Sequence, residues 1–132
     1  MYASYSSIGK TDDDKSYYVC TEIQNLDHRK KVIRENNVVC IDLWASWCEP
    51  CKIVSPKFAE LAQHYNSPGK CLLVKENIDL ELTRDYQIRA IPAFIFYKNG
   101  QLLRNEDGTP VDVVGGDIQD VKEVLDNLLK SD

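Results

Sequence analysis

An apolar strand that runs into a Cys-x-x-Cys motif constrains this chain more than any other feature of its sequence. Val38–Trp44 is an almost continuous apolar run, which is typical of a central strand covered on both faces. Residues 47–52 (WCEPCK) follow closely, and Pro50 is a residue favoured in the first turn of a helix. A long helix is therefore expected to begin at the motif.

The two cysteines of this motif, Cys48 and Cys51, form a dithiol that can close into a disulfide. A helix N-terminus carries unpaired N–H groups and a partial positive charge, which stabilise a thiolate. The thiolate is the nucleophile in disulfide exchange. Position in the helix therefore predicts that Cys48 is the exposed attacking thiol and that Cys51, one turn inside, is shielded.

A zinc site is the alternative interpretation of such a pair. Zinc usually requires four nitrogen or sulfur ligands, and the sequence has no second Cys-x-x-Cys and no Cys-x-x-His. His28 and His64 have no metal-ligand spacing. The strand-to-helix context favours redox chemistry, and no metal site is predicted.

Size and charge indicate one compact domain with a restricted set of partners. A chain of 132 residues with 43% hydrophobic content can bury a single core. Its formal net charge of -5 argues against nonspecific binding to nucleic acid or to an anionic membrane. No apolar stretch approaches the roughly 20 residues of a membrane span.

The cysteine count and the first residues bear on the compartment. Five cysteines are an odd number, which favours a reducing compartment with one functional pair and predicts a cytoplasmic protein. Residues 1–16 are polar and lack the apolar core of a signal peptide, so they are predicted to be a flexible tail that precedes a domain at residues 17–132. A targeting segment missing from this chain would make an organelle possible.

Alternating strand and helix signals predict an α/β fold in the order β-α-β-α-β-α-β-β-α. Short apolar or β-branched runs predict five strands, at residues 17–23, 38–44, 71–78, 93–98 and 111–114. Helical periodicity and capping residues predict four helices, at residues 25–36, from the motif to about 65, at 80–86 and after 117. Their crossovers imply a mixed sheet with helices on both faces.

Four separated motifs make the chain resemble the thioredoxin family over residues 17–130. They are Asp42-Leu43-Trp44-Ala45-Ser46-Trp47-Cys48-x-Pro50-Cys51-Lys52, the helix-kinking Pro56, Lys75-x-Asn77-x-Asp79, and Tyr86-x-Ile88-x-x-Ile91-Pro92. Two features depart from the family pattern. Glu49 replaces a glycine, and fourteen residues separate Gly100 from Gly115, where a short hairpin is usual.

The resemblance implies a protein-disulfide oxidoreductase with the thioredoxin fold. Its Cys48–Cys51 pair would reduce disulfides in partner proteins and would serve cellular electron transport and redox homeostasis. No bound cofactor is implied. Electrons would come from a separate thioredoxin reductase that uses NADPH and flavin, or from a small dithiol, and the protein would act as a monomer.

The resemblance also implies roles for buried residues around the dithiol. Asp42 would lie behind Cys51 and accept its proton, with Lys75 as its charged neighbour. Taken alone, Asp42 could be a satisfied buried carboxylate, and Lys75 a solvated lysine. Desolvation and a nearby thiolate predict a raised pKa for Asp42. A cis peptide before Pro92 would place the Ile91 backbone beside the dithiol.

An apolar docking surface is expected around the cysteines. It would bind substrate through the residues Trp47, Glu49, Pro50, Ile91, Pro92, Val114 and Gly115. The charge of Glu49 is expected to raise the pKa of Cys48 and to make the pair a stronger reductant, unless its side chain only points into water. The remaining cysteines, Cys20, Cys40 and Cys71, are expected to be small buried hydrophobic residues.

Two other functions stay open from the sequence. A dithiol in the same fold can be poised as a disulfide isomerase-like oxidant, because the two residues between the cysteines help to set the potential. The domain could also be a binding or assembly module, with the long segment 101–110 as the partner contact. We expect residues 105–110 to be a surface excursion far from the cysteines, with no apolar anchor in the core.

Overall fold

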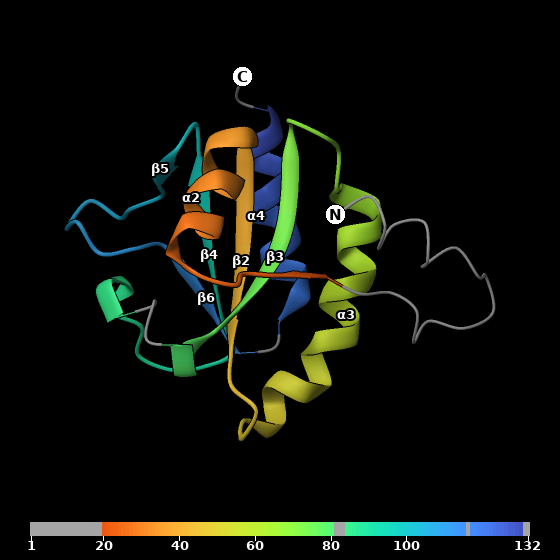
Figure 1. The fold of residues 1–132 in the computed structure, drawn as a ribbon, viewed down its shortest axis with the longest axis vertical. Coiled ribbons are helices and arrows are strands. Elements are labelled where there is room, and N and C mark those ends of the chain that lie inside the picture. Colours follow the sequence, from red (N-terminus) through yellow and green to blue (C-terminus); the bar gives the residue numbers. More distant parts are fainter. Residues whose placement is uncertain (1–19, 81–83, 116, 131–132) are drawn as a thin grey trace.

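A computed structural model of the protein describes residues 20–80, 84–115 and 117–130. The predicted tail at residues 1–16 lies outside these ranges. Along the chain the elements are β1 (Thr21–Glu22), α2 (Leu26–Glu35), β2 (Val38–Trp44), α3 (Glu49–Tyr65), β3 (Cys71–Asn77), the 3-10 turns η2 (Ile78–Leu80) and η3 (Arg84–Tyr86), β4 (Ala93–Lys98), β5 (Gln101–Leu102), β6 (Asp112–Val114) and α4 (Ile118–Lys130) (Figure 1).

The predicted strands and the helices predicted at 25–36, from the motif to about 65 and after 117 are present, with three differences. Only Thr21–Glu22 of the described residues forms the first strand, and residues 17–19 of its predicted range lie outside the description. Of the helix expected at 80–86, Leu80 ends η2 and residues 84–86 form η3, while residues 81–83 lie outside the description; the Asn77 side chain accepts from the Asp79 N–H (2.9 Å) in a tight turn where β3 ends. The third difference is an additional strand, β5, which was not predicted. It follows directly after Asn99 and Gly100, whose positive φ angles fit the predicted hairpin turn.

The sheet is mixed, as the element order predicted. Its strands lie in the order β1-β3-β2-β4-β5, and β6 also pairs with β4. Strands β1, β3 and β2 are parallel, whereas β4 is antiparallel to β2, β5 and β6. Parallel β2 and β3 therefore end at the same edge of the sheet, where α3 begins (Figure 1).

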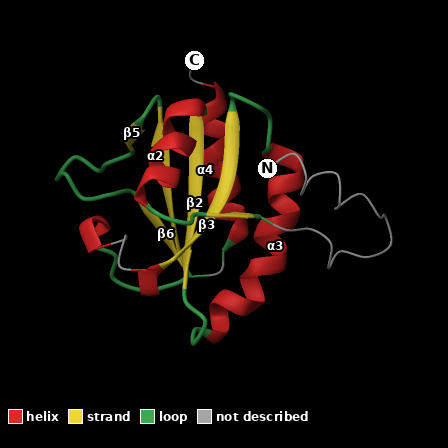
Figure 2. Ribbon diagram, viewed as in Figure 1, coloured by secondary structure: helices red, strands yellow, loops and turns green. Residues whose placement is uncertain are grey.

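Helices cover both faces of the sheet, with α2 on one face and α3 and α4 on the other (Figure 2). Val38 and Cys40 of β2 pack with the α3 and α4 core, while Val39 and Ile41 pack with the α2 core. The strand is almost entirely apolar because its residues alternate between two faces that are both covered. By the same alternation, Asp42 lies on the α3 side.

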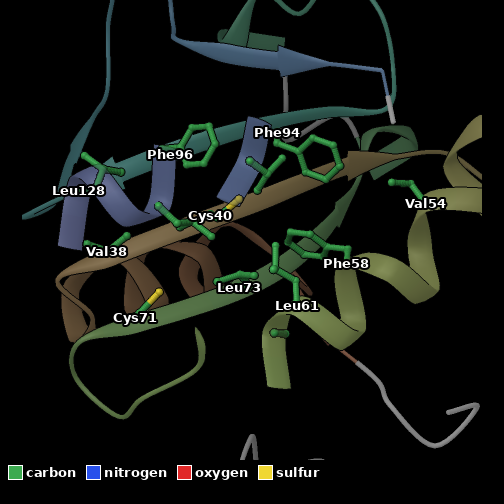
Figure 3. Close-up of a cluster of buried hydrophobic side chains, with 13 residues drawn as sticks. Val38, Cys40, Val54, Phe58, Leu61, Cys71, Leu73, Phe94, Phe96 and Leu128 are labelled. Atoms are coloured by element: carbon green, nitrogen blue, oxygen red, sulfur yellow. The ribbon is translucent and has the colours of Figure 1, made fainter. Parts of the chain in front are cut away.

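The core on the α3 and α4 side has aromatic residues at its centre. Phe58 of α3 packs on Phe94 of β4 with ring centroids 5.4 Å apart (Figure 3). The periodicity that predicted α3 and α4 is confirmed by the burial of its members, among them Val54, Leu61, Val121 and Leu125. This packing holds the start of α3 against the sheet.

The long connection between β5 and β6 is an ordered hairpin extension. Arg104 bridges to Pro110, and the Asn105 N–H donates to the Thr109 carbonyl (2.8 Å). Residues 105–109 are exposed, as expected, but Pro110 is buried, so the expectation of no apolar anchor is wrong. The extension projects from the side of the molecule, away from the end where α3 begins (Figure 1).

Candidate active site

The N-terminus of α3 carries the cysteine pair. Cys48 is the N-cap residue, and its N–H donates to the Ala45 carbonyl (3.2 Å). Cys51 lies in the first turn and is joined to Cys48 by a disulfide, with Cα atoms 5.3 Å apart. The Cys51 N–H donates to the Cys48 sulfur (3.2 Å). The Cys48 sulfur therefore receives an otherwise unpaired N–H of the helix end, the arrangement that stabilises a thiolate there.

Both cysteines are buried in this disulfide form, with exposed fractions of 5% for Cys48 and 3% for Cys51. They pack with Ala45 and against Trp44 and Ile91. Exposure therefore does not separate an attacking from a shielded sulfur in this state. The two cysteines differ in their places in the helix, because Cys48 is the N-cap residue and Cys51 lies in the first turn.

Asp42 and Lys75 are brought together by the pairing of β2 with β3. They are directly opposite in the parallel register, so both side chains point to the α3 side of the sheet. Asp42 is 1% exposed, and neither of its carboxyl oxygens has a hydrogen-bond partner among the described residues. Burial raises the pKa of Asp42 to about 7, against the opposing effect of the Lys75 charge.

The Lys75 ammonium group links the sheet to the cysteine-bearing helix. Its Nζ donates to Ser55 Oγ (2.8 Å) and lies 4.8 Å from the centre of the Trp44 ring. Ser55 is four residues after Cys51, and residues four apart lie on one face of a helix. Cys51 is thus on the face of α3 that looks toward Lys75 and Asp42.

Three of the apolar residues that were predicted to bind substrate are exposed. Trp47 is 66% exposed, and its indole N–H lies 3.4 Å from Asp79 Oδ1. Pro50 is exposed beside it, and Val114, opposite Ala93 in the β4–β6 register, is 41% exposed. Trp47, Pro50 and Val114 are therefore apolar residues that face solvent on or near the elements that hold the cysteines.

The loop before β4 lies against the cysteines. The peptide bond between Ile91 and Pro92 is cis, as the resemblance implied, and half-buried Ile91 packs against the disulfide. The Pro92 carbonyl accepts from the Gly115 N–H (2.9 Å). That bond ties the Pro92 loop to the end of β6.

Glu49 points into solvent and pairs with a neighbour of opposite charge. Its carboxylate lies 3.0 Å from Lys52 Nζ, and the two side chains are 78% and 57% exposed. The positive charge of Lys52 offsets that of Glu49, and water screens both. The arrangement fits the alternative that the Glu49 side chain only points into water better than it fits strong control of the Cys48 pKa by Glu49.

Three residues near the site were not predicted from the sequence. Ile53 is 65% exposed on α3, and Ser55 binds Lys75. Glu22 accepts a hydrogen bond from the Trp44 indole (2.7 Å). Ile53 could have been found as an apolar residue outside the apolar face of α3, whereas Ser55 and Glu22 carry no such signal.

The other cysteines belong to the core on the α3 and α4 side. Cys40 and Cys71 are buried, and Cys20 is half-buried against the same cluster. Burial raises the pKa of Cys71 to about 11 and that of Cys20 to about 12, and it raises the pKa of Cys40 well above its usual range. Thiols with such values remain protonated near neutral pH and are poor nucleophiles.

Other kinds of site are not evident in the described part of the chain. It contains no cluster of three or more histidine, cysteine or acidic side chains placed to hold a metal ion. Its helices lack the length and apolar character needed to cross a membrane. A hollow of about 760 Å³ lies near Asn37, Gly69 and Gly100, at the opposite end of β2 from the cysteines, and includes none of the predicted site residues.

Comparison with known proteins assigns the family. The thioredoxin family model matches residues 19–118. A thioredoxin of Coprinus comatus is 35% identical over 83 residues, which cover 61% of this chain and 77% of that protein. Thioredoxin-T of Drosophila melanogaster is 38% identical over 74 residues, which cover 54% of this chain but only 46% of that protein.

Solved structures agree with this assignment. The crystal structure of Malassezia sympodialis thioredoxin superposes with a TM-score of 0.68 at 30% identity and covers 84% of this chain and 94% of its own. Schistosoma mansoni thioredoxin gives a TM-score of 0.68 at 31% identity, with 83% and 95% covered. The chain belongs to the thioredoxin family. With its close cysteine pair, it is a protein-disulfide oxidoreductase of the thiol–disulfide exchange type.

Proposed function

We propose that this protein reduces disulfides in partner proteins by a two-step exchange through Cys48 and Cys51. In the first step the Cys48 thiolate attacks one sulfur of the partner disulfide. The partner S–S bond breaks, its second sulfur leaves as a thiolate that takes a proton, and a mixed disulfide forms on Cys48.

In the second step Cys51 attacks the Cys48 sulfur, and Asp42 accepts the Cys51 proton. The mixed disulfide breaks, the partner sulfur leaves as a thiolate that takes a proton from water, and the Cys48–Cys51 disulfide forms, so the partner departs as a dithiol. Two electrons have passed from this protein to the partner. The observation that supports this assignment is a disulfide at a helix N-terminus, on the helix face that looks toward a buried carboxyl group with a pKa of about 7.

Substrate docking is proposed to use the apolar surface around the disulfide. Trp47, Pro50 and Val114 supply exposed apolar contacts, and Ile91 and Pro92 bring backbone groups of an extended segment beside the sulfurs. Glu49 and Gly115 lie at the border of this surface. An extended peptide that pairs with the free backbone near Ile91 would present its disulfide to Cys48.

The oxidised protein must receive electrons before each new cycle. We propose that they come from a separate thioredoxin reductase using NADPH and flavin, or from a small dithiol, and that this chain binds no cofactor itself. We further propose a monomer in a reducing compartment, the cytoplasm, since three of the five cysteines are free thiols. Size-exclusion chromatography and localisation of the tagged protein test these two points.

Insulin disulfide reduction tests the function. The protein with thioredoxin reductase and NADPH should reduce insulin, and both Cys48→Ser and Cys51→Ser should abolish turnover. A redox potential near the value of about -270 mV known for thioredoxins supports a reductant, whereas one near the -180 mV of disulfide isomerase supports an isomerase-like oxidant. Failure to reduce insulin in the presence of a competent reductase would contradict the proposal.

A binding or assembly module is the second candidate, and the ordered hairpin extension favours it. Residues 105–109 are exposed yet held by several hydrogen bonds, so they present a defined shape. Loss of a cellular partner on removal of these residues, with insulin reduction retained, would support this second role.

A further inference from the structure

Three ionisable side chains form one row across the sheet behind the disulfide. Glu22 of β1 is directly opposite Lys75 of β3, and Lys75 is directly opposite Asp42 of β2. Directly paired residues of parallel strands point to the same face. Glu22, Lys75 and Asp42 therefore all face α3, in that order from the edge of the sheet toward its centre.

Specific contacts hold the outer member of this row in place. Glu22 Oε2 accepts from the Trp44 indole N–H at 2.7 Å, and the Lys75 ammonium lies 4.8 Å from the centre of that same ring. Glu22 is half-buried, so its charge is only partly screened by water. Trp44 in turn packs against the Cys48–Cys51 cluster.

Lys75 thus has a carboxyl group on each side, but it contacts neither Glu22 nor Asp42 in an ion pair. Its Nζ is directed to Ser55 Oγ. The pKa of Asp42 is raised first by burial, is lowered by Lys75, and is raised again by the negative charge of Glu22. The pKa of Glu22 is itself raised by burial and lowered by the Trp44 hydrogen bond and by Lys75.

We propose that Glu22 is a positioning residue for the exchange reaction: it fixes Trp44 and shares the charge of Lys75, and so keeps Asp42 a strong enough base to take the Cys51 proton. A carboxylate alone beside Lys75 would ionise more easily and would bind a proton less tightly. Glu22 competes for that lysine charge from the opposite side. The inference rests on the proposed role of Asp42 as proton acceptor.

Glu22 is the acidic side chain that shares this row with Asp42, and the other groups that face Asp42 are positive or neutral. From β3 the facing group is Lys75, from α3 it is Ser55 with the disulfide, and β4 offers Phe94. Cys20, beside Glu22, and Cys40, on β2 itself, have raised pKa values and stay neutral near pH 7.

The test measures the pKa of the Asp42 carboxyl by ¹³C NMR in the oxidised protein, together with the pH profile of insulin reduction. Glu22→Gln keeps an oxygen acceptor for Trp44 but removes the charge. It should lower the Asp42 pKa, and shift the acidic limb of the pH profile to lower pH, by about 0.5 to 1 pH unit. This is the effect expected for one partly screened charge two strands away, since two strand spacings amount to about 9.6 Å. Lys75→Gln should move the pKa in the opposite direction.

Glu35→Gln is the matched control. It removes the same charge from an exposed side chain that pairs with Lys31 on α2, and it should leave the Asp42 pKa unchanged. An Asp42 pKa that is the same in Glu22→Gln as in Glu35→Gln would overturn the proposal. If the role of Glu22 is purely structural, Glu22→Gln should lower the stability of the protein, but Glu22→Gln and Lys75→Gln should not shift the Asp42 pKa in opposite directions.

The wild-type titration provides a readout that does not depend on any variant folding. If the two carboxyl groups are coupled through Lys75, the Glu22 carboxyl resonance should show a second inflection at the Asp42 pKa. A single inflection would contradict the coupling. If Asp42→Asn reduces insulin as well as wild type at every pH, the proton-acceptor role fails, while the NMR shifts still decide whether Glu22 controls Asp42.

Discussion

Replacing Asp42 by asparagine should stabilise the protein at neutral and alkaline pH. Asp42 is 1% exposed, and its pKa is raised from 3.8 to about 7, chiefly by burial. The difference of about three pH units corresponds to about 4 kcal/mol at 1.36 kcal/mol per unit. Asparagine has a similar shape and no charge, so Asp42→Asn removes the cost of ionising this buried carboxyl group.

The pH window follows from the direction of the shift. Because the folded-state pKa is higher than the unfolded one, the native protein holds this proton more tightly, and its stabilising effect is complete below about pH 4. Between about pH 4 and pH 7 the unfolded chain ionises first, and stability falls as the pH rises. The advantage of Asp42→Asn should therefore be near zero at pH 4, grow by about 1.4 kcal/mol per pH unit, and level off near 4 kcal/mol above pH 7.

Urea unfolding of the oxidised protein at several pH values between 4 and 8 measures this difference without interference from cysteine titration. Asp27→Asn, a substitution at an exposed acid in the first turn of α2, is the control and should show no such growth. Insulin reduction by Asp42→Asn should be slower than by wild type, because Cys51 loses its proposed proton acceptor. Free energies of unfolding for Asp42→Asn and wild type that run parallel across the whole pH range would refute the reasoning.

Three further predictions concern the cysteines and the two departures from the family pattern. Cys51→Ser should trap a mixed disulfide with a substrate protein, seen on non-reducing gels, and Cys48→Ser should not; trapping by Cys48→Ser would reverse the assignment. Replacing residues 105–109 by a two-residue Asn-Gly turn, with buried Pro110 retained, should leave insulin reduction intact, and loss of folding would show that the extension is needed for packing. Glu49→Gly should lower the Cys48 pKa by only a few tenths of a pH unit at low salt, and should raise the redox potential only slightly, because Lys52 already offsets the charge of Glu49. A fall of a full unit in the Cys48 pKa would show that Glu49 is the main control of the dithiol.

The sequence was most informative where local chemistry decides the structure. The helix starts predicted at residues 25 and 117 are confirmed, because the Asn25 side chain accepts from the His28 N–H (2.8 Å) and the Asp117 side chain accepts from the Gln119 N–H (3.0 Å). The unit of β2 and α3 was predicted because a doubly covered strand and an amphipathic helix each leave a periodic signal. Strand register then brings two of the predicted site residues, Asp42 and Lys75, directly opposite each other.

Side-chain pairs between elements that are distant in the chain could not be predicted from the sequence. Arg29 of α2 and Glu76 of β3 form a buried ion pair at 2.9 Å, and Arg29 also lies 4.9 Å from the centre of the Tyr86 ring. Each residue alone resembles an ordinary surface charge in the sequence. Burial raises the pKa of Glu76, and the Arg29 charge opposes that rise, so the ion pair offsets part of the cost of burying both groups.

The Glu22 row shows the same limit at the site itself. The sequence placed Lys75 near Asp42 only through the family resemblance, and it gave Glu22 no role, because the three residues lie in three strands far apart in the chain. Their meeting depends on register: a slip of one residue in β1 would turn Glu22 to the α2 side and bring a neighbouring residue to Lys75. Strand pairing, more than the motif around the cysteines, therefore determines which charges surround Asp42, and two thioredoxins with identical Cys-x-x-Cys motifs can differ in the pH dependence of exchange.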